Sequence, residues 1–261
     1  MLVDPVDPEV RLDDSGGHKD TRTSMFMLVG GAIAPYDKWA WLESEWGPWE
    51  SQLRAGGSAD GLHMKTLFRP EVRLTDDEKL SAVSAMVGLL ETSDVRLLVS
   101  MENLGFIGAT EKEYEEAGET PDLCFANCVR LAAGVTRRHY AKGERAHFMM
   151  SQGRKRPTER TYFRVRDDES LHDCVAPSIN FGDPKDYGSL QAADLIAHFF
   201  FWCLNTAILG YAPPTYGLRD RVYAAITPRM FALERLVEFP AGYAFPMDAE
   251  TVLRMLGPLP S

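Results

Sequence analysis

Carboxylates in two distant segments are the residues of this sequence best suited to chemistry. Asp13 and Asp14 end an apolar run in "VRLDDSGG". A strand points consecutive side chains to opposite faces, so only one of the two could face a given site, and the spacing does not say which. Both could instead accept backbone N–H bonds in a turn over residues 15–17. The stretch therefore has two interpretations, an acidic turn and a strand that ends in a functional carboxylate.

A third carboxylate lies in the apolar segment "GSLQAADLIAHFFFWCL". On a helical period, one narrow polar stripe contains Tyr187, Gln191, Asp194, His198 and Asn205. A helix that is apolar on most sides is buried, so this stripe must face polar partners, water or a metal ion. The alternative is that Asp194 pairs with an arginine or caps another helix. The overlapping stretch 195–211 approaches the length of a membrane span, but His198, Asn205 and the preceding Asp194 favour a helix buried in a protein core.

Three further features could assist these acids. His63 follows a Gly-rich loop in "GLHMKTLF", although a lone histidine is more often structural than catalytic. Glu102, just after the strand "VRLLVSM", could supply another ligand. The run "GRKRPTERTYFRVR" is predicted to be a basic loop, which either contacts a phosphate backbone or pairs with the many acids of the chain. Its candidate nucleic-acid-binding residues are Arg154, Lys155, Arg156 and Arg160.

Composition limits the classes of protein that fit the chain. Its 261 residues are 45% hydrophobic and 25% charged, which argues against disorder and fibres. The net charge of -10 repels polyanions, so any nucleic-acid contact must come from the local basic run. The N-terminus lacks the pattern of a signal peptide, and we expect a cytoplasmic protein that does not cross a membrane.

The four cysteines favour buried thiols in a reducing compartment, because they are few and include no C-x-x-C pair. Cys124 and Cys128 are one helical turn apart, and His172 precedes Cys174 by two residues. A zinc site is therefore conceivable. We interpret the cysteines as core thiols.

The expected elements form a mixed sheet flanked by helices in a single domain, residues 1–261. Strands at 9–14 and 24–34 form an antiparallel pair joined by the short connection "SGGHKDTRT", and further strands follow at 94–101, 145–151 and 175–180. Helices are expected at 36–53, at about 121–140 and 188–204, and at 219–239. We expect Gly47-Pro48 to break the first and Pro228 to kink or divide the last.

Two other patterns belong to the helices. Thr75 and Glu78 have the spacing of a capping box at the start of "TDDEKLSAVSAMVGLLE". The four tryptophans at positions 39, 41, 46 and 49 are interpreted as core residues or as a surface for a partner.

Four motifs in one order resemble a bacterial family catalogued as domain of unknown function 3800. They are "LDDSG", "LVGGAIA", "LHMK" and "SLQAADLIA", and the likeness covers about residues 10–202. That family looks like a member of the ribonuclease H-like superfamily. The resemblance implies a core at about 9–206 with a mixed sheet opening with antiparallel strands, followed by a C-terminal helical extension at about 207–261.

The resemblance also implies a site in which an acid on the first strand and an acid on a late helix hold a divalent metal. The matching residues are Asp13, Asp14 at the family's usual Glu, His63, Gln191 and Asp194. Carboxylate oxygens suit Mg²⁺ or Mn²⁺, and His63 or His198 could orient water or shuttle a proton.

The superfamily commonly has another acid at the end of a central strand. Here that segment, "AHFMMSQGRK", offers Ser151 and Gln152. We therefore predict a metal-dependent nuclease or other phosphodiester hydrolase that acts on nucleic acid. The alternative is a non-catalytic binding or regulatory module that has lost this acid.

Overall fold

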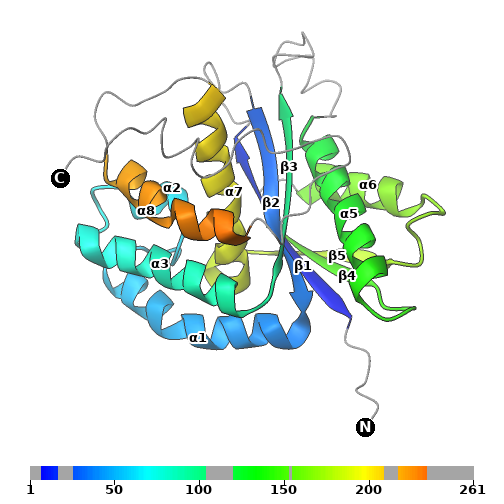
Figure 1. Cartoon of the computed structure of the whole chain (residues 1–261), viewed down its shortest axis with the longest axis horizontal. Helices are drawn as coiled ribbons and strands as arrows, with labels where there is room; N and C mark the ends of the chain where they lie inside the picture. The colour runs from blue at the N-terminus through cyan, green and yellow to red at the C-terminus, as the bar shows by residue number, and fades with distance from the viewer. Residues whose placement is uncertain (1–6, 17–25, 104–119, 153–154, 209–216, 234–261) are drawn as a thin grey trace.

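The computed structural model describes residues 7–16, 26–103, 120–152, 155–208 and 217–233, which form a five-stranded mixed sheet flanked by helices (Figure 1). The strands are β1 (Pro8–Gly16), β2 (Phe26–Pro35), β3 (Arg96–Asn103), β4 (Ala146–Ser151) and β5 (Val175–Gly182), in the spatial order β3-β2-β1-β4-β5. The pairs β1–β2 and β2–β3 are antiparallel, whereas β1–β4 and β4–β5 are parallel. The predicted mixed sheet with an antiparallel opening pair is confirmed. Most of the predicted connection between the first two strands, residues 17–25, lies outside the described residues.

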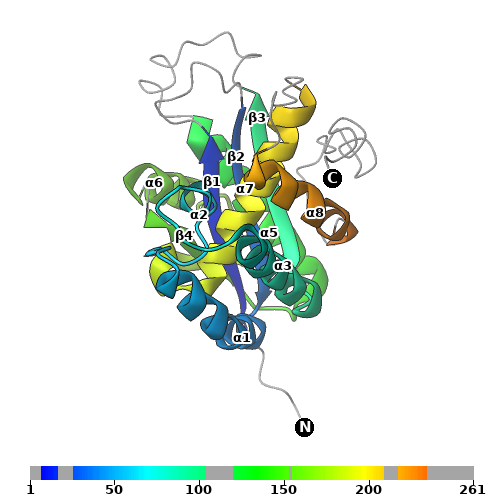
Figure 2. The ribbon, with the colours of Figure 1, turned by 90° about the vertical axis from the view of Figure 1, so that its left-hand side faces the viewer.

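Helices cover both faces of the sheet. One face carries α1 (Tyr36–Ala55), α2 (Met64–Leu67), α3 (Asp76–Thr92), α7 (Gly188–Ile208) and α8 (Leu218–Ala232), which share one apolar core and are seen in Figure 2. The other face carries α5 (Thr120–His139) and α6 (Lys155–Arg166) over a second core. The sheet therefore separates two apolar layers, and a residue on any strand belongs to one of them.

Alternation along the central strand β1 decides which acid faces which layer. Val10 and Leu12 belong to the core under α5 and α6, so Asp14 falls on that face. Arg11 contacts α7 through Ser189, and Ser15 contacts it through His198. Asp13 lies between them on the same face. The strand interpretation of the opening acidic stretch holds, and Asp13 is the carboxylate directed to α7.

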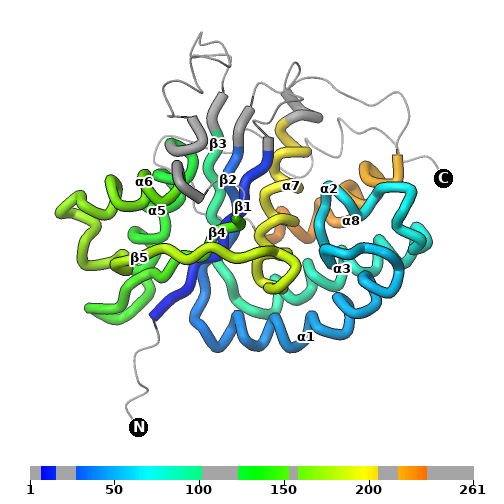
Figure 3. Tube along the Cα trace, turned by 180° about the vertical axis from the view of Figure 1, so that it is seen from behind, coloured from blue at the N-terminus to red at the C-terminus, as the bar shows by residue number. Residues whose placement is uncertain are grey.

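The helix α7 is buried against β1 and β2, as its sequence predicted. Figure 3, seen from behind, shows the chain passing from β5 to the start of α7, which lies on the sheet face opposite α5 and α6. Among the described residues, no helix combines the length and apolar character needed to cross a membrane.

The predicted break at Gly47-Pro48 is wrong, and Pro228 does not divide the last helix, whereas a kink at Pro228 stays a prediction. Helix α1 continues through Pro48, and α8 continues through Pro228. A proline removes one internal hydrogen bond, but buried residues flank both prolines, Trp46 and Leu53 in α1 and Ile226 and Met230 in α8. Apolar burial on each side holds the helices together across the missing bond.

Three smaller predictions are confirmed. The Thr75 hydroxyl accepts a bond from the Glu78 N–H at 3.2 Å, and the Glu78 carboxylate accepts one from the Thr75 N–H at 2.7 Å. The four cysteines are buried free thiols. Trp39 and Trp46 are core residues, whereas Trp41 is exposed.

Gly30 on β2 lets α7 lie unusually close to the sheet. It pairs with Asp13 across the β1–β2 ladder, so it is on the face that α7 covers. A Cβ atom at this position would lie 2.9 Å from Ala197 Cα and 3.1 Å from Ala197 N. Both are backbone atoms, so only a shift of α7 could make room. The glycine therefore sets the separation of helix and sheet next to Asp13.

The Gly30→Ala variant is expected to lower the free energy of unfolding by about 1–3 kcal/mol, because the added methyl overpacks against the α7 backbone. Urea unfolding measures the effect. Gly134→Ala in α5 is the matched control, since its Cβ would meet only the mobile end of Arg138 at 3.3 Å. That variant should be unchanged or gain up to about 1 kcal/mol. Equal stability of the two variants would contradict the proposed close packing.

Candidate functional site

The carboxyl groups of Asp13 and Asp194 meet between β1 and α7. Asp13 is 6% exposed and Asp194 is 1% exposed, and the two side chains are close enough to hydrogen-bond to each other. They are 181 positions apart in the sequence, and the packing of α7 over β1 joins them. The structure thus brings together the two acids that the sequence suggested as metal ligands.

Backbone amides hold each carboxylate in place. The Asp14 N–H donates to Asp13 Oδ1 at 2.8 Å. The Met64 N–H donates to Asp194 Oδ2 at 2.7 Å, at the first residue of α2. Asp194 therefore also fixes the start of α2, which was the structural alternative for this residue. Its second oxygen, Oδ1, is left for other partners.

Two histidines face that second oxygen. His198 Nε2 is 3.5 Å from Asp194 Oδ1, and His63 Nε2 is 3.8 Å from the same atom. The other ring nitrogens meet hydroxyl groups, His198 Nδ1 with Ser15 Oγ at 3.3 Å and His63 Nδ1 with Thr66 Oγ1 at 3.2 Å. About a quarter of each histidine side chain is exposed, 24% for His198 and 27% for His63. The histidines therefore connect the buried acids to the surface.

Gln191 has a structural part in this arrangement. Its Oε1 accepts bonds from Trp46 Nε1 at 2.9 Å and from the Leu62 N–H at 2.8 Å. Its Nε2 donates to Glu50 Oε1 at 2.7 Å and to the Pro184 carbonyl at 3.0 Å. These four bonds use the full capacity of the amide. Gln191 does not face the acids but fixes the loop that delivers His63.

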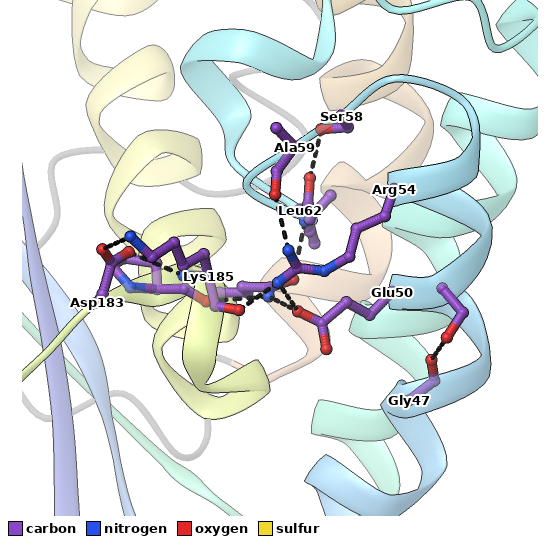
Figure 4. A network of polar contacts seen from close by, with 12 residues as sticks. Gly47, Glu50, Arg54, Ser58, Ala59, Leu62, Asp183 and Lys185 are labelled. Carbon is purple, nitrogen blue, oxygen red and sulfur yellow. Dashed lines mark hydrogen bonds and ion pairs between the residues drawn. The ribbon is translucent and has the colours of Figure 1, made fainter.

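A surface network reinforces the same loop (Figure 4). Arg54 on α1 donates to Glu50 Oε1 and to the Ala59 carbonyl, each at 2.8 Å, and also to the Lys185 carbonyl. Ser58 Oγ donates to the Gly61 carbonyl at 2.6 Å. The loop before His63 is therefore held by α1, by the segment before α7 and by its own side chains.

Burial controls the electrostatics of the site. Desolvation raises the pKa of Asp13 well above its usual range, and the negative charges of Asp194 and Asp14 raise it further. Desolvation also lowers the pKa of His198, although the charge of Asp194 opposes that shift. At neutral pH, His198 is therefore a neutral imidazole that can accept a proton.

Other predicted residues lie elsewhere. Asp14 is on the opposite face of β1 from Asp194. Glu102 is in the edge strand β3, which β2 separates from β1, and its side chain is outside the described part of the structure. In β4, Met150 pairs with Leu12, so the next residue, Ser151, is nearest to Asp13 in the register. The central strand therefore places a hydroxyl, not an acid, beside Asp13.

The predicted basic loop is wrong, because these residues form the helix α6. Thr158, Tyr162 and Val165 are buried at helical spacing, and the Tyr162 hydroxyl donates to the Ala176 carbonyl at 2.8 Å. This apolar stripe was present in the sequence and should have indicated a helix. Arg160 is exposed on the face opposite α7.

The remaining residues of the basic run are described less fully. Arg154 lies outside the described residues, and of Lys155 and Arg156 only the backbone is described.

Two contributors to the site were missed from the sequence. Ser15 shares a face of β1 with Asp13, and the two-residue spacing could have revealed it. Arg219 acts on His198 electrostatically from α8, and no spacing in the sequence indicates that proximity.

Comparisons with protein-family models, with curated proteins and with solved structures found no match for this chain. Within the described residues, no group of three or more His, Cys, Asp or Glu side chains has the arrangement of a metal-holding cluster. The two acids and their neighbours are therefore the features from which a function can be inferred.

Asp13→Asn is expected to raise the free energy of unfolding at pH 7 in EDTA by about 1–2 kcal/mol, because the amide avoids the cost of keeping a buried carboxyl group protonated or charged beside Asp194. The amide still accepts the Asp14 N–H bond and can donate to Asp194. Asp167→Asn at an exposed acid is the control and should change little.

The gain in the free energy of unfolding from Asp13→Asn should increase with pH. The pKa of Asp13 is raised by folding, so the wild type loses stability as the pH rises from the unfolded pKa of about 3.9 through the folded value. The variant lacks this loss. Urea unfolding between pH 4 and 8 should show its advantage growing with pH, and an advantage that shrinks with rising pH would contradict the assignment.

Proposed function

We propose that the protein is a divalent-metal-dependent hydrolase of phosphodiester bonds, with nucleic acid as its substrate. The observation that carries the proposal is the contact between the buried carboxyl groups of Asp13 and Asp194. Two carboxylates out of water repel each other unless a proton or a cation lies between them. Perturbed acids beside partly exposed histidines are typical of functional sites.

The donor set suits Mg²⁺ or Mn²⁺. These ions prefer carboxylate oxygens and keep several of their waters, so two protein ligands from Asp13 and Asp194 are enough to hold one. A bound ion would neutralise the acid pair and lower the pKa of its water. The backbone N–H groups of Asp14 and Met64 fix the orientation of both carboxylates.

His198 and His63 would serve the reaction as proton carriers. His198 is held by Ser15 at one nitrogen and directs the other to Asp194. As a neutral imidazole, it can take a proton from an attacking water, and its exposed part allows exchange with solvent. His63 has the matching arrangement with Thr66 and can supply a proton to the leaving oxygen.

A ribonuclease H-like arrangement and the resemblance to domain of unknown function 3800 are parts of the same proposal. They are supported by the mixed sheet that opens with an antiparallel pair and by an acid of the first strand facing a late helix. Ser151 beside Asp13 favours the second candidate, a non-catalytic module that binds without cleaving.

We expect Mg²⁺- or Mn²⁺-dependent cleavage of single-stranded or duplex nucleic acid, reduced at least about 100-fold in Asp13→Asn and in Asp194→Asn. Gel assays over a metal titration measure it, with EDTA as the metal-free control. Asp167→Asn, which makes the same substitution at an exposed acid, is the matched variant and should keep wild-type rates.

Thermal unfolding separates the two candidates. A ligand that binds only the native state must stabilise it, so millimolar Mn²⁺ should raise the Tm of the wild type but not of Asp194→Asn. The absence of any Tm shift in the wild type at millimolar Mn²⁺ would favour the binding module. Cleavage that persists in both acid variants would remove Asp13 and Asp194 from the site.

A further inference from the structure

The start of α8 is anchored to α7 one turn beyond His198. Asp194, His198 and Trp202 are spaced four residues apart and share one side of α7. Trp202 Nε1 donates to Asp220 Oδ1 at 2.9 Å, and Asp220 Oδ2 accepts the Gly217 N–H bond at 3.2 Å. The first turn of α8 is therefore fixed next to the exposed end of the acid–histidine site.

Arg219 lies on the side of α8 that faces this site. Tyr223 is four residues later on the same side of the helix. Its ring centroid is 5.0 Å from that of Trp202 and 6.4 Å from that of Phe68, which follows α2, with the rings tilted in both pairs. Arg219 is one turn closer to the start of α8 and is exposed to solvent. Its guanidinium is near enough to His198 to act on it electrostatically. The side chain is thus accessible and within electrostatic range of His198.

The charge of Arg219 distinguishes it from the other groups around the site. The ionisable neighbours that act most strongly on His198 are Asp194, His63, Arg219 and Asp14. Of these, Arg219 alone carries a permanent positive charge. An anionic substrate approaching two carboxylates needs such a charge to offset their repulsion, and a guanidinium can bind two phosphate oxygens at once.

We propose that Arg219 binds the phosphate group of the substrate and so makes the acid–histidine site selective for phosphodiesters. The inference rests on the proposed function and extends it to a residue of α8. Arg221 forms an ion pair with Asp76 on α3 at 2.8 Å, whereas Arg219 forms no ion pair within the part of the chain that the structure describes. Arg221 is therefore the matched control, two residues away on the same helix.

The test is steady-state hydrolysis of bis(p-nitrophenyl) phosphate with Mn²⁺ by the full-length protein. We expect Arg219→Gln to raise KM about tenfold or more and to change kcat less than about threefold. The substitution removes a charged hydrogen bond to the phosphate that is present equally in the bound substrate and in the transition state. The KM of Arg219→Lys should lie between those of the wild type and Arg219→Gln. Arg221→Gln should have the KM and kcat of the wild type. An unchanged KM in Arg219→Gln, or a loss confined to kcat, would overturn the assignment.

A binding experiment keeps the inference testable if the wild type cleaves nothing. A short fluorescein-labelled single-stranded oligonucleotide is titrated in EDTA and followed by anisotropy. If Arg219→Gln weakens binding about tenfold and Arg221→Gln does not, Arg219 is a phosphate-binding residue although the hydrolase proposal fails. Equal binding by all three proteins, or no binding by the wild type, would overturn the role of Arg219 as well.

Discussion

The separation between α7 and the sheet at Gly30 is the constraint on which the site depends. Gly30 is paired with Asp13, and Ala197 of α7 lies directly over it. Ala197 also falls between Asp194 and His198 in the sequence. Small residues on both surfaces therefore let the helix backbone approach the strand where the acids meet. A larger side chain at either position would hold the helix away and separate the carboxyl groups.

The same helix then positions the rest of the site. Asp194 holds the start of α2 through the Met64 N–H, and Gln191, one turn earlier, holds the preceding loop through the Leu62 N–H. His63 lies between these two anchored residues. Its position beside Asp194 thus follows from α7, although it belongs to a different segment. A change at Gln191 would affect His63 without touching the acids.

Local patterns in the sequence were sufficient to predict much of the fold. The strands, the capping box at Thr75 and the burial of α7 follow from periodicity and capping chemistry, which depend on neighbours in the chain. The break predicted at Pro48 and a division of the last helix at Pro228 were wrong because tertiary burial outweighed a local rule. The basic run was interpreted as a loop because its charges concealed the buried stripe of Thr158, Tyr162 and Val165.

The candidate site also has some features that local sequence patterns could predict and others that depend on tertiary packing. Asp13 and Asp194 could be suggested from the sequence, Asp194 by the polar stripe in its apolar helix and both by resemblance, whereas strand alternation could not choose between Asp13 and Asp14. The contact between Asp13 and Asp194 could not be predicted, because 181 positions separate them and only the packing at Gly30 joins them. The position of Arg219 near the site depends on the packing of α8 on α7 through the hydrogen bond between Asp220 and Trp202, and no local sequence pattern predicts that contact.

Arg11 provides an internal comparison that bears on the nature of the acid pair. It is two residues from Asp13 on the same face of β1 and is also buried. Its charge is balanced by Glu9 at 2.5 Å, and its Nε donates to Ser189. Asp13 meets another acid instead, and among the described residues neither Asp13 nor Asp194 forms an ion pair with lysine or arginine.

A fold that balances one buried charge and leaves the next unbalanced does so against its own stability. Asparagine could make the same bond to the Asp14 N–H without charge. The acid pair is therefore better explained by chemistry than by folding, and a divalent cation is the partner whose charge would balance it.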